Sequence, residues 1–423
     1  MESKHEYHVA ADLDTAWANF EPDLPLQTDT GKDHPFYVNR SDTVMKRLKR
    51  KLLRSYMKPP KYFLSGHRGC GKSTELYRLA ANRDIRDRYW PVHFSIRDHA
   101  DLNDLDFKEV LLAMGGRLYN QYEKEGSKDI DKQLQKELAS WRGSLEEEVT
   151  TLQAGRLTGE VGAEIGSLFA NLSSKIKLEP KTRHEIRQVL ERDVTGLVTL
   201  INNIINEITA KEGKQPLILI DDLDKITDLG RARQIFIDQQ GILRQPACPI
   251  VYTISSSLFY DPKFPTVRIE PIFLPNITLH EHQDRSRRNE AGHQLLQTFV
   301  LRRIKQNLIT DAALEKAAAK SGGVFRELVR LLRDSLDFSQ DADQAVITET
   351  AMTQAATELR NTYWRVLTQE QLDILRDIRK GNDKHDPQEI GPLLQMLAVL
   401  EYDSSEGSWY DVHPVLEELL LES

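Results

Sequence analysis

The feature that most constrains the fold is the segment GHRGCGKS at residues 66–73 of this 423-residue chain. It fits G-x-x-x-x-G-K-[S/T] at every fixed position, and an apolar run from Tyr62 to Leu64 precedes it. By average residue frequencies, such a match arises by chance about one or two times in a hundred chains of this length. Glycines let backbone N–H groups converge on phosphate oxygens at the N-terminus of the next helix. The segment therefore predicts a strand, a phosphate-binding loop (P-loop) and a helix in that order.

The side chains of this loop have distinct expected roles around a nucleotide. Lys72 neutralises the β- and γ-phosphates, and Ser73 ligates Mg²⁺. The residues expected to surround the phosphates are Gly66, His67, Arg68, Gly69, Cys70, Gly71, Lys72, Ser73 and Thr74. A nucleotide and Mg²⁺ are therefore the predicted cofactors.

A second segment supplies the acids that such a site needs. The apolar run 217–220 predicts a strand that delivers Asp221 and Asp222 at its carboxyl end, where open α/β sheets bind ligands. Asp221 is the candidate Mg²⁺ ligand, and Asp222 is the candidate that polarises the attacking water. Asp224 could share either role. Adjacent acids after a strand are often solvated loop residues, and the preceding P-loop is what favours the catalytic interpretation.

Apolar strands alternate with amphipathic helices through the first two thirds of the chain. This alternation predicts an α/β fold with a parallel sheet covered by helices on both faces. Beyond it, residues 290–356 have a helical pattern throughout, and the last sixty residues show helices, a hairpin near Gly407 and a short helix, typical of a winged helix. Besides the two strands above, the expected strands are 90–96, 249–254 and 267–269, and the expected core helices include 106–122, 184–211 and 230–243.

These patterns divide the chain into four parts. The expected parts are an N-terminal arm at 1–34, a P-loop core at 35–275 with an insertion at about 123–182, an all-α lid at 276–358 and a winged-helix domain at 359–423. Trp17 and Phe20 are possible anchors of the arm on the body or on a partner. The insertion carries an apolar stripe from Leu157 to Leu172 that is compatible with a helix packed on the core, a partner-binding segment or a membrane-touching segment.

The motifs together resemble the AAA+ and STAND branch of P-loop ATPases, particularly the origin-recognition-like group. The segments that carry this resemblance are SGHRGCGKST, LILIDDLDKI, a strand ending in TISSS, and SGGVFRELVRLL. The resemblance implies ATP as the nucleotide, and sensor positions at Thr253 and Ser255. It also implies that Arg326, in the lid motif that begins at Gly323, reaches the γ-phosphate.

The same resemblance implies that the PFYVNR segment, with Val38, Asn39 and Arg40, lies near the adenine. Lys72, Asp222, Ser255 and Arg326 are accordingly the expected catalytic residues. Many AAA+ proteins carry a glutamate at the position of Asp222. The shorter aspartate instead resembles STAND switch ATPases, and this resemblance implies slow ATP turnover. Arg231, Arg233 and Arg244 are candidates for an arginine finger by position alone.

Composition narrows the cellular context. Two cysteines cannot form a disulfide scaffold, and the start of the chain lacks the basic and apolar regions of a secretion signal. A cytoplasmic protein without membrane-spanning segments is therefore expected. The net charge is −8, and residues 361–423 carry five basic and 13 acidic residues. An acidic winged helix disfavours DNA contact, unless the basic helix at 46–54 holds phosphates rather than presenting a solvated face.

Three functional hypotheses follow. The favoured one is an ATP-controlled switch that self-associates and acts with a separate effector or regulatory protein, in a bacterial antiphage defence system as the resemblance implies. The second is a DNA-engaging initiator or loader ATPase. The third is a scaffold locked by nucleotide with negligible hydrolysis.

Overall fold

The computed structural model describes residues 7–23, 25–27, 33–40, 43–54, 57–126, 129–152, 180–282, 284–382, 385–404 and 407–421. Its centre is a five-stranded parallel sheet in the order β2-β3-β4-β1-β5. The strands are β1 (Lys61–Ser65), β2 (Tyr89–Ser95), β3 (Gln215–Asp221), β4 (Ile250–Ile254) and β5 (Glu270–Phe273). The predicted α/β class with a parallel sheet is therefore confirmed.

Alternating side chains of the central strands belong to two separate apolar clusters. Tyr62 and Leu64 of β1 pack with one set of helices, and Phe63 between them packs with the other. This is the period of two expected of a strand that is buried on both faces. One face is covered by α2 (Thr43–Leu53), α3 (Lys72–Ala81) and α4 (Arg83–Arg88), and the other by α5 (Phe107–Glu125), α8 (Pro180–Arg192), α9 (Val194–Glu212) and α10 (Leu229–Arg233).

Three core elements differ from the sequence-based expectation. The helix predicted at 184–211 is two helices, because Asp193 ends α8 and its carboxylate accepts a hydrogen bond from the Gly196 N–H at the start of α9. The helix predicted at 230–243 is divided into α10, a π-helical turn (Gln234–Asp238) and α11 (Gln240–Leu243). The strand predicted at 267–269 lies slightly later, as β5.

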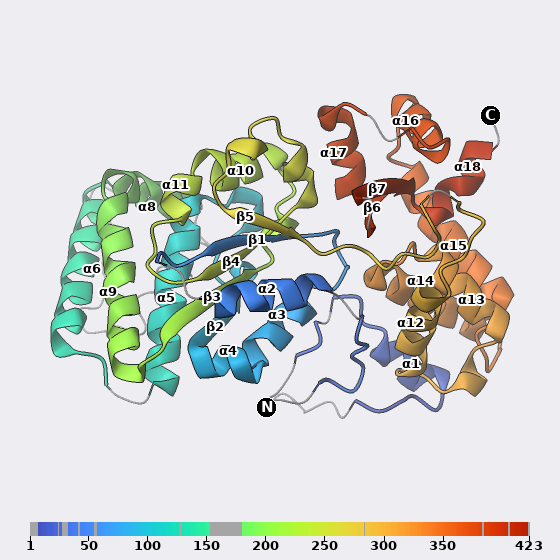
Figure 1. Ribbon diagram of the computed structural model, residues 1–423, viewed down its shortest axis with the longest axis horizontal. Helices are drawn as coiled ribbons and strands as arrows, with labels where there is room; N and C mark the ends of the chain where they lie inside the picture. The colour runs from blue at the N-terminus through green and yellow to red at the C-terminus, as the bar shows by residue number, and fades with distance from the viewer. Residues whose placement is uncertain are drawn as a thin grey trace.

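The insertion begins with α6 (Lys132–Leu152), which packs against α8 and α9 (Figure 1). The apolar stripe predicted at 157–172 lies outside the described residues.

The C-terminal part packs as one body beside the sheet (Figure 1). Four lid helices precede two winged-helix helices and a hairpin, and buried residues from all of them belong to one apolar cluster. Helix α1 (Leu13–Asn19) of the N-terminal arm joins that cluster through Phe20, which follows it and is fully buried. The elements are α12 (Glu290–Leu301), α13 (Asp311–Lys320), α14 (Phe325–Asp341), α15 (Glu349–Trp364), α16 (Gln369–Arg379), α17 (Pro387–Gln395), β6 (Val399–Ser404), β7 (Gly407–Val412) and α18 (Glu417–Leu421).

Candidate nucleotide-binding site

The P-loop lies between β1 and α3, as the sequence predicts. Its glycine at position 69 has φ 83°, in the left-handed region, and a Cβ there would lie 2.3 Å from the Cβ of Arg326. Only a residue without a side chain lets the lid approach this closely. The backbone N–H of Arg326 also donates to the Gly69 carbonyl at 3.3 Å. Lid and P-loop are therefore in direct backbone contact.

Lys72 is held inside the loop that it follows. Its side chain is 4% exposed, and its Nζ donates to the carbonyls of Gly66 at 2.8 Å and His67 at 2.9 Å. A carboxylate oxygen of Asp224 lies 2.8 Å from the same Nζ. Burial alone would lower the pKa of Lys72, but the charge and hydrogen bond of Asp224, together with the charges of Cys70 and Asp221, outweigh burial and the pKa is raised. Asp224 is thus placed as the partner of Lys72.

Asp221 ends β3 as a buried carboxylate. Burial, and then the charges of Asp224 and Asp222, raise its pKa to about 6. Its side chain accepts hydrogen bonds from the Ser73 hydroxyl and from the Asp222 N–H, the latter at 2.8 Å. Carboxylate oxygens of the three aspartates lie within 4.8 Å of one another. Oxygen ligands crowded in this way, with Ser73 beside them, fit a hard divalent cation such as Mg²⁺.

Asp222 is engaged on both sides of its carboxylate. It accepts from the Ser95 hydroxyl at 2.5 Å and pairs with Lys225 at 2.7 Å. Burial raises its pKa, but the hydrogen bonds from Lys225 and Ser95 outweigh that effect, so the pKa is lowered. Its backbone is left-handed, with φ 66°, a conformation uncommon for a residue with a side chain. Asp222 is therefore an ionised group held in a fixed orientation beside the P-loop.

The two predicted sensor positions are not among the residues that line the nucleotide cavity. The Thr253 hydroxyl donates to the Ile220 carbonyl at 3.3 Å and accepts from the Leu223 N–H at 3.1 Å, which ties β4 to the acidic loop. The Ser255 hydroxyl accepts from the Ser257 N–H and so begins a 3₁₀ turn. The expectation that Ser255 is catalytic is corrected, because its side chain caps that turn.

The N-terminal segment forms the other wall of the cavity, as the resemblance implies for the adenine. Phe36, Tyr37, Val38 and Arg40 all line the cavity. Asn39 does not, and instead lines a groove between the ends of α2, α3 and α4. Position 39 is therefore the one part of this expectation that the structure does not bring to the cavity.

Two groups that the sequence did not single out complete this wall. Phe299 of α12 lines the cavity, and the guanidinium of Arg303 lies 3.5 Å from its ring centroid. Burial, and then the charge of Arg302, lower the pKa of Arg303 to about 9. Arg303 lies in the turn that follows α12, and its guanidinium donates back to the Phe299 carbonyl at 2.8 Å. No motif marks them, because their relation to the P-loop arises only from the packing of the lid.

Arg68, Cys70 and Thr74 line the cavity and are also held by contacts within the chain. Arg68 donates to the Lys225 carbonyl at 3.1 Å, and Cys70 is buried, while its carbonyl accepts from the Arg40 guanidinium at 2.6 Å. Thr74 accepts the N–H of Leu26 at 3.2 Å. These contacts brace the loop from both sides.

His67 points to the winged helix. It is 2% exposed, and its Nε2 accepts the backbone N–H of Glu401 in β6 at 2.7 Å. Burial, and then the charge of Lys72, lower the pKa of His67 to about 3, so the ring is neutral. The P-loop and the winged helix are thereby hydrogen-bonded to each other.

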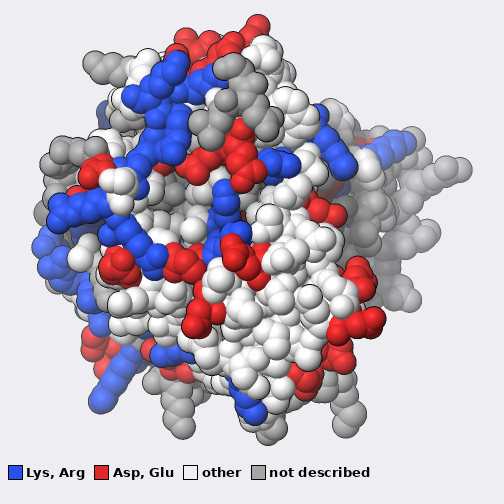
Figure 2. Space-filling model, turned by 90° about the vertical axis from the view of Figure 1, so that its right-hand side faces the viewer, with Lys and Arg blue, Asp and Glu red and all other residues white. Residues whose placement is uncertain are grey.

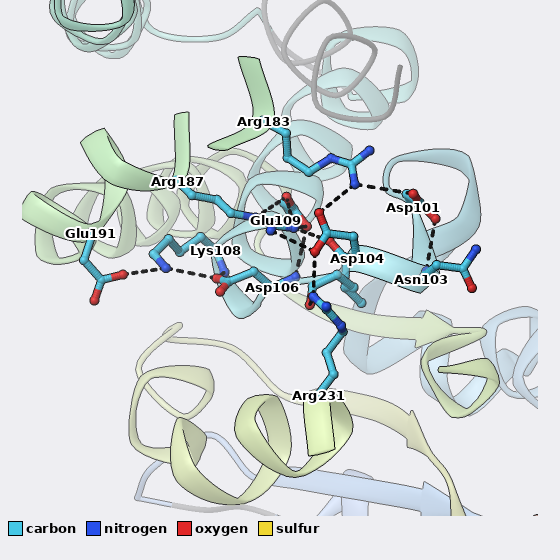
Figure 3. Close-up of polar contacts among 11 residues, drawn as sticks. Asp101, Asn103, Asp104, Asp106, Lys108, Glu109, Arg183, Arg187, Glu191 and Arg231 are labelled. Carbon is cyan, nitrogen blue, oxygen red and sulfur yellow. Dashed lines mark hydrogen bonds and ion pairs between the residues drawn. The ribbon is translucent and has the colours of Figure 1, made fainter. Parts of the chain in front are cut away.

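Two of the three arginine-finger candidates are engaged within the chain. Arg231 pairs with Asp104 at 2.7 Å in a network that joins α5, α8 and α10 (Figure 3), and Arg233 pairs with Asp261 at 3.0 Å. Arg244 is exposed at the end of α11. The identity of a finger stays a prediction.

Sequence comparison finds one distant relative with a description. No family model matches the chain. A curated protein of Methanocaldococcus jannaschii, described as an uncharacterised ATP-binding protein, is 27% identical over 168 residues. The match covers 40% of this chain and 38% of that protein, so well under half of the relative is represented.

Three solved structures that match over most of the chain have TM-scores below 0.5 and low sequence identity. The ORC2 protein of Aeropyrum pernix, in ADPNP and ADP complexes, has a TM-score of 0.44 and 11% identity, with 95% of each chain covered. Cdc6p from Pyrobaculum aerophilum has a TM-score of 0.42 and 9% identity, with 96% of each chain covered. Drosophila ORC bound to DNA has a TM-score of 0.41 and 12% identity, covering 100% of this chain and 94% of that one.

Within the described residues, every helix is too short or too polar to cross a membrane. The helical C-terminal part packs beside the P-loop core, and the bounds of the four expected parts stay predictions. The chain therefore has a parallel α/β core whose P-loop follows β1 and contacts the helical C-terminal part.

Proposed function

We propose that this protein is an ATP-binding and ATP-hydrolysing switch that controls assembly with, or activation of, a separate effector protein in a bacterial defence system. The observation that carries the switch is the hydrogen bond from Glu401 to His67, because it joins a phosphate-binding loop to a domain that can move. Defence as the setting rests on the resemblance to STAND proteins.

The chemistry rests on charge placement around the terminal phosphates. Lys72 binds the β- and γ-phosphates once nucleotide competes with Asp224 for its ammonium group. Ser73 and Asp221 would hold Mg²⁺, which supplies charge neutralisation between phosphates when bound. Asp222 orients the attacking water, and its ties to Ser95 and Lys225 favour slow turnover because they compete for the same carboxylate.

Further contacts between core and winged helix support coupling to nucleotide. The Ser257 hydroxyl donates to the Gly391 carbonyl at 3.0 Å, and Gln395 donates to the Thr227 carbonyl at 2.9 Å. Tyr260 and Tyr410 bond through their hydroxyls. A shift of the P-loop on binding phosphate would therefore strain these hydrogen bonds between the core and the winged helix. ATP changes the populations of two domain arrangements if it binds one of them more tightly than the other.

The first test measures ATP turnover by the purified chain, with Lys72→Ala as the inactive control. The variants His67→Gln and His67→Leu then test the coupling between the P-loop and the winged helix. The Gln side chain can accept a hydrogen bond from the Glu401 N–H, whereas Leu cannot. Hydrogen exchange of β6 should respond to a non-hydrolysable ATP analogue in the wild type and His67→Gln but not in His67→Leu. An equal response in all three proteins would show that coupling runs elsewhere.

A second candidate function, DNA engagement, is favoured by the basic surface of α2 and α4. The apolar positions of α2 are buried in the sheet layer, which leaves its basic side chains outward. Three acids nearby are each paired, Asp84 with Lys49, Glu270 with Lys51, and Asp87 with Arg83. The exposed cations of this surface are Lys46, Arg47, Arg50, Arg54, Arg83, Arg86 and Arg88.

The lid side of the molecule, which faces the viewer in Figure 2, is not uniformly charged. Figure 2 shows Lys and Arg interspersed with Asp and Glu around a broad uncharged area on the lid side.

Addition of duplex DNA to the turnover assay separates the two functions. Stimulation by DNA that disappears at high salt would favour the DNA-engaging function, and no stimulation with Lys72-dependent turnover supports the protein-directed switch.

A further inference from the structure

A short segment of the N-terminal arm crosses the nucleotide cavity, and its first end is fixed to the lid. We name residues 20–23 and 25–27 the strap. Phe20 is fully buried in the lid cluster, and the carboxylate of Glu21 pairs with Arg333 of α14 at 2.7 Å. The guanidinium of Arg333 also lies 3.5 Å from the ring centroid of Trp17 in α1. The strap therefore moves with the lid at this end.

The second end of the strap is fixed to the P-loop helix. The Leu26 N–H donates to the Thr74 hydroxyl at 3.2 Å, and the Gln27 side chain hydrogen-bonds Tyr77. Thr74 and Tyr77 are one helical turn apart on α3, directly after the P-loop. Strap residues line the nucleotide cavity between these two ends.

The middle of the strap contacts the arginine expected to reach the γ-phosphate. The carboxylate of Asp23 lies 3.0 Å from the guanidinium of Arg326. The backbone N–H of Arg326 donates to the Gly69 carbonyl, so the Cα of Arg326 stays beside the P-loop as long as the lid does. Prolines at 22 and 25 restrict the backbone of the strap, which lowers the entropy lost in holding Asp23 there.

We propose that the strap is an autoinhibitory gate, in which Asp23 holds Arg326 until the terminal phosphate of a nucleoside triphosphate displaces it. A phosphate oxygen and a carboxylate oxygen compete for the same guanidinium, because both are charge-assisted hydrogen-bond acceptors. A diphosphate lacks the competing group and leaves the pair intact. This inference rests on the proposed function only in requiring a nucleotide in the P-loop, and it supplies a means of distinguishing ATP from ADP.

The test compares two neutralising variants in the same strap by titration calorimetry with a non-hydrolysable ATP analogue and with ADP. Asp23→Asn removes the carboxylate charge that competes with the γ-phosphate for the Arg326 guanidinium. Glu21→Gln is the control, because it removes an equal charge that pairs with Arg333 instead. Breaking an exposed ion pair is worth up to about fivefold in affinity. We expect Asp23→Asn to tighten the ATP analogue about three- to fivefold relative to ADP, and Glu21→Gln to leave that ratio within twofold of the wild type.

A second measurement follows the strap itself. Amide exchange at Leu26 and Gln27 should accelerate with the ATP analogue and not with ADP. An unchanged ATP-to-ADP ratio in Asp23→Asn, or a ratio shifted equally by Glu21→Gln, would overturn the gate. Failure of the wild type to bind either nucleotide would instead overturn the proposed function, so the two failures are distinguishable.

Discussion

Two charged clusters in the core differ in how their acids are satisfied. The phosphate-site cluster contains Asp221, whose buried carboxylate makes hydrogen bonds to Ser73 and the backbone and no ion pair among the described residues. In the α5–α8 cluster, Asp104 accepts from Arg183, Arg187 and Arg231 (Figure 3). The full α5–α8 cluster consists of Asp101, Asp104, Asp106, Lys108, Glu109, Arg183, Arg187, Glu191 and Arg231.

The pKa values express this difference. Burial raises the pKa of both carboxyls, but hydrogen bonds from Arg187 and Arg183 outweigh it at Asp104 and lower the pKa there. At Asp221 the neighbouring acids add to burial, and the pKa rises to about 6. In the α5–α8 cluster, the ion pairs hold α8 on the core. In the phosphate-site cluster, Asp221 lacks such a pair, so a bound cation can stabilise its ionised form.

The largest effect expected in the phosphate-site cluster comes from Lys72→Ala. Loss of the buried ammonium removes the charge aimed at the β- and γ-phosphates, so kcat/KM for ATP should fall about 10³-fold. Turnover assays with matched amounts of folded protein measure this. Lys225→Ala is the comparison variant, because it removes a lysine that pairs with Asp222 outside the P-loop; an equal loss there would contradict the assignment.

Substitutions in the α5–α8 cluster should lower the unfolding free energy and leave nucleotide affinity nearly unchanged. Burial already raises the pKa of Glu109 to about 7, and Arg187→Met removes the arginine that opposes this rise, so the carboxyl should protonate on folding. The variant should cost up to about 3 kcal/mol of unfolding free energy. Urea denaturation measures the loss, and nucleotide affinity per folded molecule should stay within about twofold of the wild type. A large change in affinity at full folding would mean that the two clusters are coupled.

The pH dependence of the phosphate site follows from Asp221. Its ionised form is needed to ligate Mg²⁺, so Mg²⁺-dependent nucleotide affinity should fall about tenfold between pH 7 and pH 5 as the carboxyl protonates around pH 6. Titrations of nucleotide with and without Mg²⁺ across this range check it. Asp221→Asn should bind weakly at both pH values, and a similar pH slope in that variant would assign the titration to another group.

The sign of the same pKa shift predicts a stability effect without ligand. Because the folded pKa lies above its ordinary value, the contribution of Asp221 to stability is present below about pH 4 and is lost as the pH rises through about 6. At pH 7.5 Asp221→Asn should therefore raise the unfolding free energy by about 1–3 kcal/mol. Thermal unfolding at pH 5 and pH 7.5, without Mg²⁺, measures the difference.

The smallest effect is expected at the exposed edge of the α5–α8 cluster. Arg231 is 27% exposed and its partner Asp104 is 41% exposed, so Arg231→Ala should cost under about 1 kcal/mol. Turnover that collapses on this substitution and recovers when a second, intact chain is added would show that Arg231 leaves its cluster to serve a neighbouring subunit.

The sequence predicts the parts of the site that are local in the chain. The P-loop, the acids after β3 and the basic face of α2 depend on residues close together, so spacing and propensity are sufficient. The partner of His67 is 334 positions away and that of Arg326 lies in the N-terminal arm. Such contacts depend on how the lid and winged helix dock. Ser255 is a different case, because β4 ends at Ile254 as predicted, and the Ser255 hydroxyl then accepts a local hydrogen bond from the Ser257 N–H that the resemblance does not reveal.

The packing of α1 on the lid has a consequence for synthesis on the ribosome. Asn19 bonds the carbonyl of Arg303, 284 positions later, and Phe20 is buried by lid residues from the same late part of the chain. At about 5–20 residues per second, the first helix waits roughly 15–60 s before its docking surface has been translated. The N-terminal arm is therefore translated first but docks on the lid only after the lid has been translated. A complete nucleotide pocket can form only after most of the chain has emerged, so a stalled or truncated product lacks one wall of it.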